Sequence, residues 1–303
     1  MVDLTTDFAG ISLRNPVLLA SGTCGYGEEL APFLDLSRLG GIVTKTITPE
    51  PRAGNAPPRI VETAAGMLNS IGLQNPGLEG FVRDKWPYLA RLDTKIVVNI
   101  AAPTAALHGE MAARLEDLEG IAGIEVNISS PNMKDGGMLF GCSPSASQEV
   151  IAAVRAATKR PVIAKLTPNV TDITKIARAV QEGGADGIAM INTLLGMAID
   201  WKSQKAILGN ITGGLSGPAI KPVALALLWK VRQAVDIPIM GLGGIATADD
   251  AMEFFVAGAS AIQVGTTTFV EPGAAADIVA GIESNCEGAG VSRVQELVNT
   301  LRT

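Results

Sequence analysis

The sequence predicts an α/β protein with the (β/α)8 architecture of a TIM barrel, and three observations lead to this prediction. Eight short apolar runs rich in β-branched residues recur along the chain. Segments of helical length separate them, as in a parallel sheet with helical crossovers. The 303 residues suffice for one barrel of about 250 residues with insertions. A doubly wound sheet is the alternative, but it usually has fewer strands and one glycine-rich first turn. We therefore expect one domain, residues 1–303.

Most of the predicted strands are continuous apolar stretches and not strict alternations of apolar and polar residues. This pattern is typical of parallel strands that are covered on both faces. In chain order the strands are residues 17–21, 41–46, 96–101, 124–129, 162–167, 187–192, 237–243 and 261–266.

Helical patterns lie between the strands, and three of them are well marked. They cover residues 171–184, 221–235 and 247–258. The last begins with a capping-box pattern, in which Asp250 follows Thr247 by three residues, and it closes on Gly258.

Two connections are longer than a barrel needs, residues 47–75 and residues 129–145 after the fourth strand. Long ordered loops in a compact domain are usually functional. The first connection contains the segment NSIGLQNPG, which has two interpretations. It is either a simple turn or a substrate-binding loop, and its amides Asn69, Gln74 and Asn75 favour the loop.

Composition excludes several classes of function. Aromatic residues make up only 4% of the chain and the net charge is −6, which disfavours nucleic-acid binding. The three cysteines form no CxxC pair, so a zinc ribbon or an iron–sulfur cluster held by this chain alone is not expected. No HExxH, GxSxG or GxxxxGKS motif occurs. Without a signal peptide or a long apolar run, we expect a soluble, cytoplasmic protein.

All eight predicted strands end in a polar residue or glycine, at the face where barrels place their active sites. These ends are Ser21-Gly22, Lys45-Thr46, Asn99, Asn127, Lys165, Asn192-Thr193, Gly243-Gly244 and Gly265-Thr266. Each of the two lysines follows an apolar run, so we expect it to be partly buried beside an anion. The alternative is that each lysine extends from the strand end into water.

The glycines that end the last two strands fit a phosphate site, although such pairs are also ordinary turn residues. Acidic residues are scarce at the strand ends, which disfavours a two-carboxylate glycosidase. We interpret His108 as a structural residue at a helix boundary. The set suits an anionic, planar, phosphorylated ligand. Flavin mononucleotide (FMN) fits, as do many phosphorylated metabolites.

Seven segments resemble the dihydroorotate dehydrogenases, most closely the catalytic subunit of the NAD-dependent class 1B enzymes. They are NPVLLASG (15–22), GMLNSIGLQNPG (66–77), VNISSPN (126–132), KLTPNVTDI (165–173), MINTLLGM (190–197), NITGGLSGPAIKPVAL (210–225) and AGASAIQVGT (257–266). The segment at 210–225 is more typical of class 1B than of class 1A. It also separates the chain from the dihydropyrimidine dehydrogenase domain.

The resemblance implies one FMN-binding barrel and assigns residues to the flavin. These residues are Ser21, Lys45, Thr46, Asn99, Asn127, Lys165, Ile191, Gly217, Gly243, Gly244, Gly265 and Thr266. The backbone amides of the last four would hold the phosphate. Lys165 would lie near N1 and O2 of the ring, where negative charge gathers on reduction.

The resemblance also implies the reaction, which is oxidation of (S)-dihydroorotate to orotate in pyrimidine (UMP) biosynthesis. A base takes the C5 proton and hydride passes from C6 to N5 of FMN. The residues that would bind the orotate ring and its carboxylate are Lys45, Asn69, Ser70, Ile71, Gly72, Leu73, Asn127, Asn192 and Thr193.

The chain departs from the class 1 pattern at the catalytic base. The expected motif is N-I-S-C-P-N, whereas residues 127–132 read NISSPN, so Ser130 replaces the cysteine. A thiol titrates near ~8.5 and a serine hydroxyl far higher, so serine needs a proton relay. Three interpretations remain: Ser130 is native and active, it is an engineered replacement that slows turnover, or the reaction is lost or changed. We favour Ser130 as the base, with Lys45 and Lys165 as the other catalytic residues. Cys142 is a poor substitute.

Class 2 enzymes use serine at this point, but their amphipathic N-terminal extension is not expected here because the first strand begins by residue 17. Class 1B enzymes pass electrons to a subunit that carries FAD and a [2Fe–2S] cluster, and then to NAD. The resemblance thus implies a homodimer flanked by two such subunits, a heterotetramer. The alternatives are an FMN oxidoreductase for another dihydropyrimidine and a flavin-binding subunit whose turnover Ser130 impairs.

Overall fold

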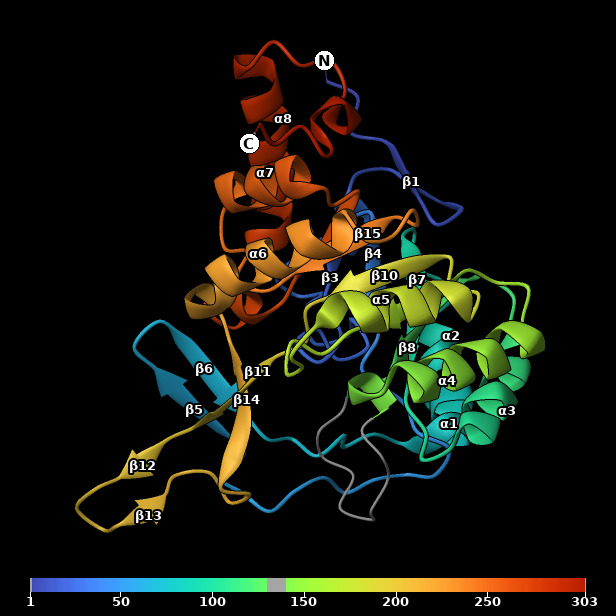
Figure 1. The fold of residues 1–303 in the computed structure, drawn as a ribbon, viewed down its shortest axis with the longest axis vertical. Coiled ribbons are helices and arrows are strands. Elements are labelled where there is room, and N and C mark those ends of the chain that lie inside the picture. Colours follow the sequence, from blue (N-terminus) through green and yellow to red (C-terminus); the bar gives the residue numbers. More distant parts are fainter. Residues whose placement is uncertain (1, 130–139, 303) are drawn as a thin grey trace.

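The computed structural model describes residues 2–129 and 140–302, and eight of its strands close into a parallel barrel (Figure 1). Around the barrel the strands follow chain order: β3 (Val17–Leu19), β4 (Gly41–Val43), β7 (Lys95–Ile100), β8 (Ile121–Asn127), β9 (Val162–Lys165), β10 (Gly187–Met190), β15 (Ile239–Leu242) and β16 (Ala261–Val264). Each lies within or overlaps one predicted strand, so the (β/α)8 prediction is confirmed.

All eight barrel strands end earlier than the sequence predicted. The predicted strand 41–46 shows the physical reason, because its regular pairing with β7 is interrupted at Lys45. The Thr44 N–H still donates to Val97 of the neighbouring strand, but the Lys45 N–H donates to Gly25 in the loop after β3. Pairing with β7 resumes at Ile47, whose N–H donates to Asn99, so this apolar run ends in an interrupted strand.

Helices surround the barrel on its outer side (Figure 1). They are α3 (Ala105–Glu116), α4 (Pro144–Ala157), α5 (Ile173–Glu182), α6 (Lys221–Arg232), α7 (Ala248–Ala257) and α8 (Ala274–Gly288). Two short helices, α1 (Gly77–Gly80) and α2 (Trp86–Leu89), are joined by one wider helical turn, Phe81–Lys85. Among the described residues, no helix combines the length and the apolar character needed to cross a membrane.

The capping box predicted at residue 247 is present at the start of α7. The Thr247 hydroxyl accepts a hydrogen bond from the Asp250 N–H at 3.2 Å, and the Asp250 carboxylate accepts one from the Thr247 N–H at 2.8 Å. Gly258 ends the helix with a φ of +119°. Lys221 at the start of α6 pairs with Asp250 at 2.6 Å, so the same carboxylate ties the two helix starts together.

A second, antiparallel sheet lies beyond the carboxyl ends of the barrel strands, and the sequence analysis did not predict it. Its order is β11 (Leu194–Met197), β14 (Thr212–Ser216), β6 (Gly66–Asn69) and β5 (Ile60–Thr63). A small hairpin of β12 (Ile199–Asp200) and β13 (Lys205–Ala206) projects from it (Figure 1). The connection at 47–75, predicted to be a loop, therefore contributes two strands.

The opposite end of the barrel is closed by the hairpin of β1 (Thr6–Phe8) and β2 (Ile11–Leu13). Phe8 is fully buried and packs with Leu18, Val97 and other apolar residues of the barrel interior. A larger apolar cluster fills the space between the barrel and its helices. The amino-terminal half of the interior is thus solid, which leaves the carboxyl ends of the strands as the open face.

Candidate active site

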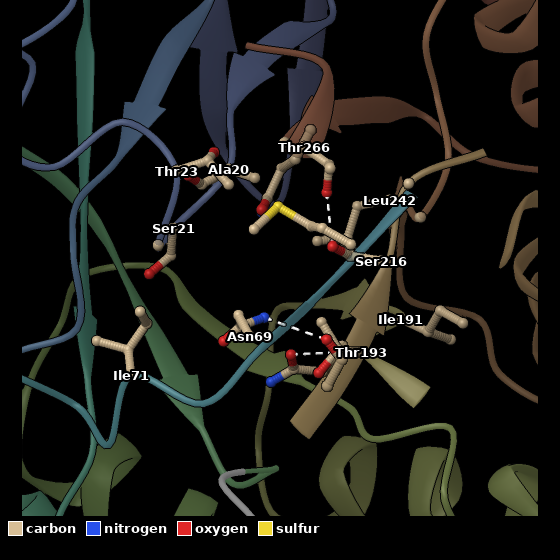
Figure 2. A pocket seen from close by; sticks show the side chains of 18 of the residues that line it. Ala20, Ser21, Thr23, Asn69, Ile71, Ile191, Thr193, Ser216, Leu242 and Thr266 are labelled. Carbon is tan, nitrogen blue, oxygen red and sulfur yellow. Dashed lines mark hydrogen bonds between the residues drawn. The ribbon is translucent and has the colours of Figure 1, made fainter. Parts of the chain in front are cut away.

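One cavity lies between the carboxyl ends of the barrel strands and the antiparallel sheet. Figure 2 shows side chains from both parts around it, including Ser21 from the barrel and Asn69 from β6. All the residues that the sequence analysis assigned to a flavin line this cavity except Asn99. All those that it assigned to the substrate line the cavity except Ser70. Residues of distant chain segments therefore meet at one place.

The two exceptions lie behind the cavity wall. Ser70 is almost fully buried, and its hydroxyl accepts a hydrogen bond from Asn55 at 3.0 Å, so its side chain contacts the loop before β5. Asn99 is fully buried, and its amide donates to Glu125 at 2.5 Å.

The cavity holds two lysines whose surroundings differ. Lys165 is buried, and its ammonium lies 3.3 Å from the carboxylate of Glu125, so the anionic partner expected for this lysine is present. Lys45 has no ion pair with any residue that the structure describes. Burial, together with the charge of Lys165, lowers the pKa of Lys45. This arrangement leaves Lys45 available for an anionic ligand.

At the end of the cavity formed by the last two barrel strands, the backbone itself is exposed to the space. Gly217, Gly243 and Gly244 have φ values of +95°, +123° and +82°, a region that favours glycine. A Cβ at Gly244 would come within 2.8 Å of the Lys221 backbone nitrogen. Thr266 stands beside them and donates a hydrogen bond to the Ser216 hydroxyl at 2.8 Å (Figure 2). Such a backbone surface suits a phosphate group.

Amides and a hydroxyl form a connected chain on the side of β8 and β10. Asn192 donates to the Ser129 hydroxyl at 2.6 Å, and this hydroxyl donates to Asn127 at 2.8 Å. Asn192 also accepts from the Thr193 N–H at 2.8 Å. These bonds fix the orientation of groups that can read the polar edge of a planar ring.

Several lining residues were missed by the sequence analysis. They are Ala20, Thr23, Ile60, Met67, Gly214, Ser216, Ile220, Leu242, Ile245, Gln263, Thr267 and Phe269. Ile60 and Met67 belong to the unpredicted sheet, which had no continuous apolar run to reveal it. Glu125 was also missed, although one signal existed: it is the single acidic residue inside the run IEVNIS.

Three further candidates remain to be placed. Ser130 lies outside the described residues, and the chain is described up to its neighbour Ser129. Cys142 is exposed and lies beside residues 168–171. His108 lies in the first turn of α3, where its Nε2 accepts from the Ala102 N–H at 3.0 Å. Burial lowers the pKa of His108 to about 4, so it is a neutral structural residue.

Comparisons with known proteins agree with one another. A family model described as dihydroorotate dehydrogenase matches residues 3–285. The catalytic subunit of dihydroorotate dehydrogenase B (NAD(+)) from Pelobacter propionicus is 54% identical over 299 residues, which cover 99% of this chain and 98% of that protein. The corresponding subunit from Geotalea uraniireducens is 52% identical over 301 residues, 99% of each chain.

A solved structure is also similar to this one. It is the dihydroorotate dehydrogenase of Eimeria tenella in complex with ferulenol, with a TM-score of 0.82 and 25% sequence identity. The match covers 98% of this chain and 88% of that one.

Proposed function

The chain belongs to the dihydroorotate dehydrogenase family, and from this premise we propose that it is the catalytic subunit of an NAD-linked enzyme that oxidises (S)-dihydroorotate to orotate in pyrimidine biosynthesis. The observation that carries the proposal is the full-length identity with relatives of that name, 54% over 99% of this chain for one of them. The cavity supports it, because two lysines and several amides face a space at the catalytic end of the barrel.

The residues present fit FMN. The backbone at Gly243 and Gly244 lines the cavity in a positive-φ conformation, and a Cβ on Gly244 would collide with Lys221 behind it. Gly265 and Thr266 also line the cavity, at the start of a helical turn. We assign the phosphate to this surface, and the flavin ring to the space between Lys165, Thr46 and Asn127. When bound there, FMN would supply the acceptor for the hydride that leaves C6 of the substrate.

The remaining chemistry belongs to side chains of this chain. Lys45 would bind the substrate carboxylate, since no described carboxylate pairs with it. Asn69, Asn127, Asn192 and Thr193 would orient the pyrimidine ring through its amide groups. Ser130 would take the proton from C5. Its neighbour Ser129 is bonded to Asn127 and Asn192 at the cavity wall, which supports a role for the next residue in the same site.

We further propose the assembly that the name "catalytic subunit" suggests for the relatives. In it, two copies of this chain form a dimer, and each passes electrons to a partner subunit with FAD and a [2Fe–2S] cluster, which reduces NAD. An NAD-linked reaction of this kind fits the cytoplasmic location expected from the sequence.

An absorption spectrum of the purified chain with FMN, followed by anaerobic addition of dihydroorotate, tests the proposal. We expect a flavin spectrum whose visible band bleaches on addition of the substrate. A protein that takes up no FMN would contradict the whole proposal. A flavin that dihydroorotate does not bleach, but another dihydropyrimidine does, would assign the cavity to that other substrate.

A further inference from the structure

A buried polar cluster lies directly behind the cavity, centred on Glu125 of β8. None of the Glu125 surface is exposed, and it does not line the cavity. One carboxylate oxygen accepts from Asn99 at 2.5 Å and lies 3.3 Å from the Lys165 ammonium. The other accepts from Gln263 at 2.7 Å. The partners come from β7, β9 and β16, and Lys165 and Gln263 do line the cavity.

The position of this cluster in the barrel is unusual for charged groups. Two positions before each of its three partners stands an apolar residue of the barrel interior. These apolar residues are Val97, Ile163 and Ala261. Residues two apart on a strand share a face, so the cluster forms the next layer of the interior, between the apolar plug and the cavity. A buried carboxylate is costly and adds little stability even when it is paired. Stability alone therefore does not account for Glu125, whereas two of its partners face the cavity.

The charges at the cavity give such a reason. Lys45 and Lys165 bring two positive charges, and Glu125 is the carboxylate that pairs with Lys165. Without Glu125, both lysines would act on a bound ligand uncompensated. The Glu125 carboxylate thus weakens the attraction of Lys165 for negative charge on a bound ligand. It also fixes the position of the Lys165 ammonium.

We propose that Glu125 is a positioning residue that holds the Lys165 ammonium against the bound flavin and offsets its charge. This inference rests on the proposed function. Reduction of FMN takes up two electrons and one proton and leaves negative charge near N1 and O2, which a cation there stabilises. By offsetting that cation, Glu125 keeps the reduction potential of the flavin low. A low potential favours onward transfer of both electrons towards NAD, which is itself a weak oxidant.

The test compares the midpoint potential of bound FMN in the wild type and in Glu125→Gln, by equilibration with a dye of known potential. Glutamine keeps the shape of the side chain and removes its charge. We expect Glu125→Gln to raise the affinity for reduced FMN at least tenfold relative to the affinity for oxidised FMN. This ratio corresponds to an upward shift of the midpoint potential of about 30 mV for a two-electron couple. The dissociation constant of oxidised FMN, measured by titration of the apoprotein, gives the reference for this ratio.

Asp186→Asn is the matched control. It also removes one carboxylate from an ion pair, with Arg155 at 2.7 Å, but neither residue lines the cavity. We expect its flavin potential to equal that of the wild type. If Glu125→Gln leaves the potential unchanged or lowers it, or if Asp186→Asn raises it equally, the inference is wrong.

Three further outcomes are distinguishable. If Glu125→Gln does not fold, Glu125→Asp keeps the charge but withdraws it from Lys165, and it must then shift the potential upward by a smaller amount for the inference to stand. If the wild type takes up no FMN, the proposed function fails. If the wild type binds FMN and is bleached by dihydroorotate while Glu125→Gln matches its potential, only the role of Glu125 fails.

Discussion

At the scale of single residues, the proposed proton acceptor Ser130 differs chemically from the cysteine expected in its motif. Its neighbour Ser129 is buried and is bonded to Asn127 and Asn192, two residues that line the cavity. A serine in the next position has a hydroxyl that does not ionise at neutral pH. It can act as a base only if a neighbouring group or a water takes the proton onward.

Replacement of Ser130 by alanine tests this role. We expect the rate of flavin reduction by dihydroorotate to fall at least a hundredfold, because a positioned general base contributes roughly that much or more. FMN binding should be retained. Stopped-flow absorption under anaerobic conditions measures the rate. Ser145→Ala, an exposed serine at the start of α4, is the control and should keep the wild-type rate. An unchanged rate in Ser130→Ala would assign the base to another group.

A second residue-scale prediction concerns His108 and pH. Burial lowers its pKa from 6.5 to about 4, so the unfolded chain binds more protons than the folded one between these values. The contribution of the neutral His108 to the free energy of unfolding is complete above pH 6.5. It is lost progressively as the pH falls towards 4. The shift corresponds to roughly 3 kcal/mol over this window. Urea unfolding at pH 5 and pH 7 should show a larger loss of stability in the wild type than in His108→Gln. Equal losses would contradict the prediction.

At the scale of elements, strands with a continuous apolar run were predictable and short two-sided strands were not. All eight barrel strands come from such runs, because parallel strands are covered on both faces. β5 and β11 have only four residues each, and their burial alternates between exposed and partly buried. Such strands resemble loops in sequence, so the sheet that covers the cavity was missed.

The same contrast applies to the candidate site. Lys45, Asn127 and Lys165 could be found because a polar residue at the end of an apolar run is conspicuous. Gln263 and Glu125 lie within their strands, and their pairing joins β8 to β16, 138 residues apart. No local pattern announces a hydrogen bond over such a separation. The sequence therefore identified the rim of the cavity better than the layer behind it.

The proposed phosphate surface at Gly243 and Gly244 offers a prediction at the scale of elements. Gly244 has a φ of +82°, and a Cβ there would lie 2.8 Å from the Lys221 backbone nitrogen and 2.9 Å from the Gly217 oxygen. We expect Gly244→Ala to weaken FMN binding at least tenfold, because the backbone must move out of the position that holds the phosphate. Fluorescence titration with FMN measures this. Gly288→Ala, where no atom lies within 4 Å of the new Cβ, should bind FMN like the wild type. Equal affinities in the two variants would place the phosphate elsewhere.

At the scale of the whole molecule, the cavity connects parts that are otherwise separate. Its lining comes from the last residues of seven of the eight barrel strands or the loops that follow them, and from the antiparallel sheet at the carboxyl end of the barrel. The hairpin of β1 and β2 and the apolar interior close the other end. A ligand in the cavity therefore contacts both the barrel and the antiparallel sheet. Its binding free energy then adds to the free energy of unfolding of the whole chain.

Ligand binding should accordingly raise the thermal stability of the entire chain. At a free FMN concentration of a hundred times the dissociation constant, linkage gives about 2.7 kcal/mol. We expect one cooperative transition whose Tm rises by several degrees and continues to rise with FMN concentration. Riboflavin carries the same ring but no phosphate, so at equal concentration it should raise Tm less, because the backbone surface at Gly243 and Gly244 then has no anion to bind. Scanning calorimetry with both ligands measures the difference. If riboflavin raised Tm as much as FMN, the glycine surface would not be a phosphate site, and the ring alone would account for binding.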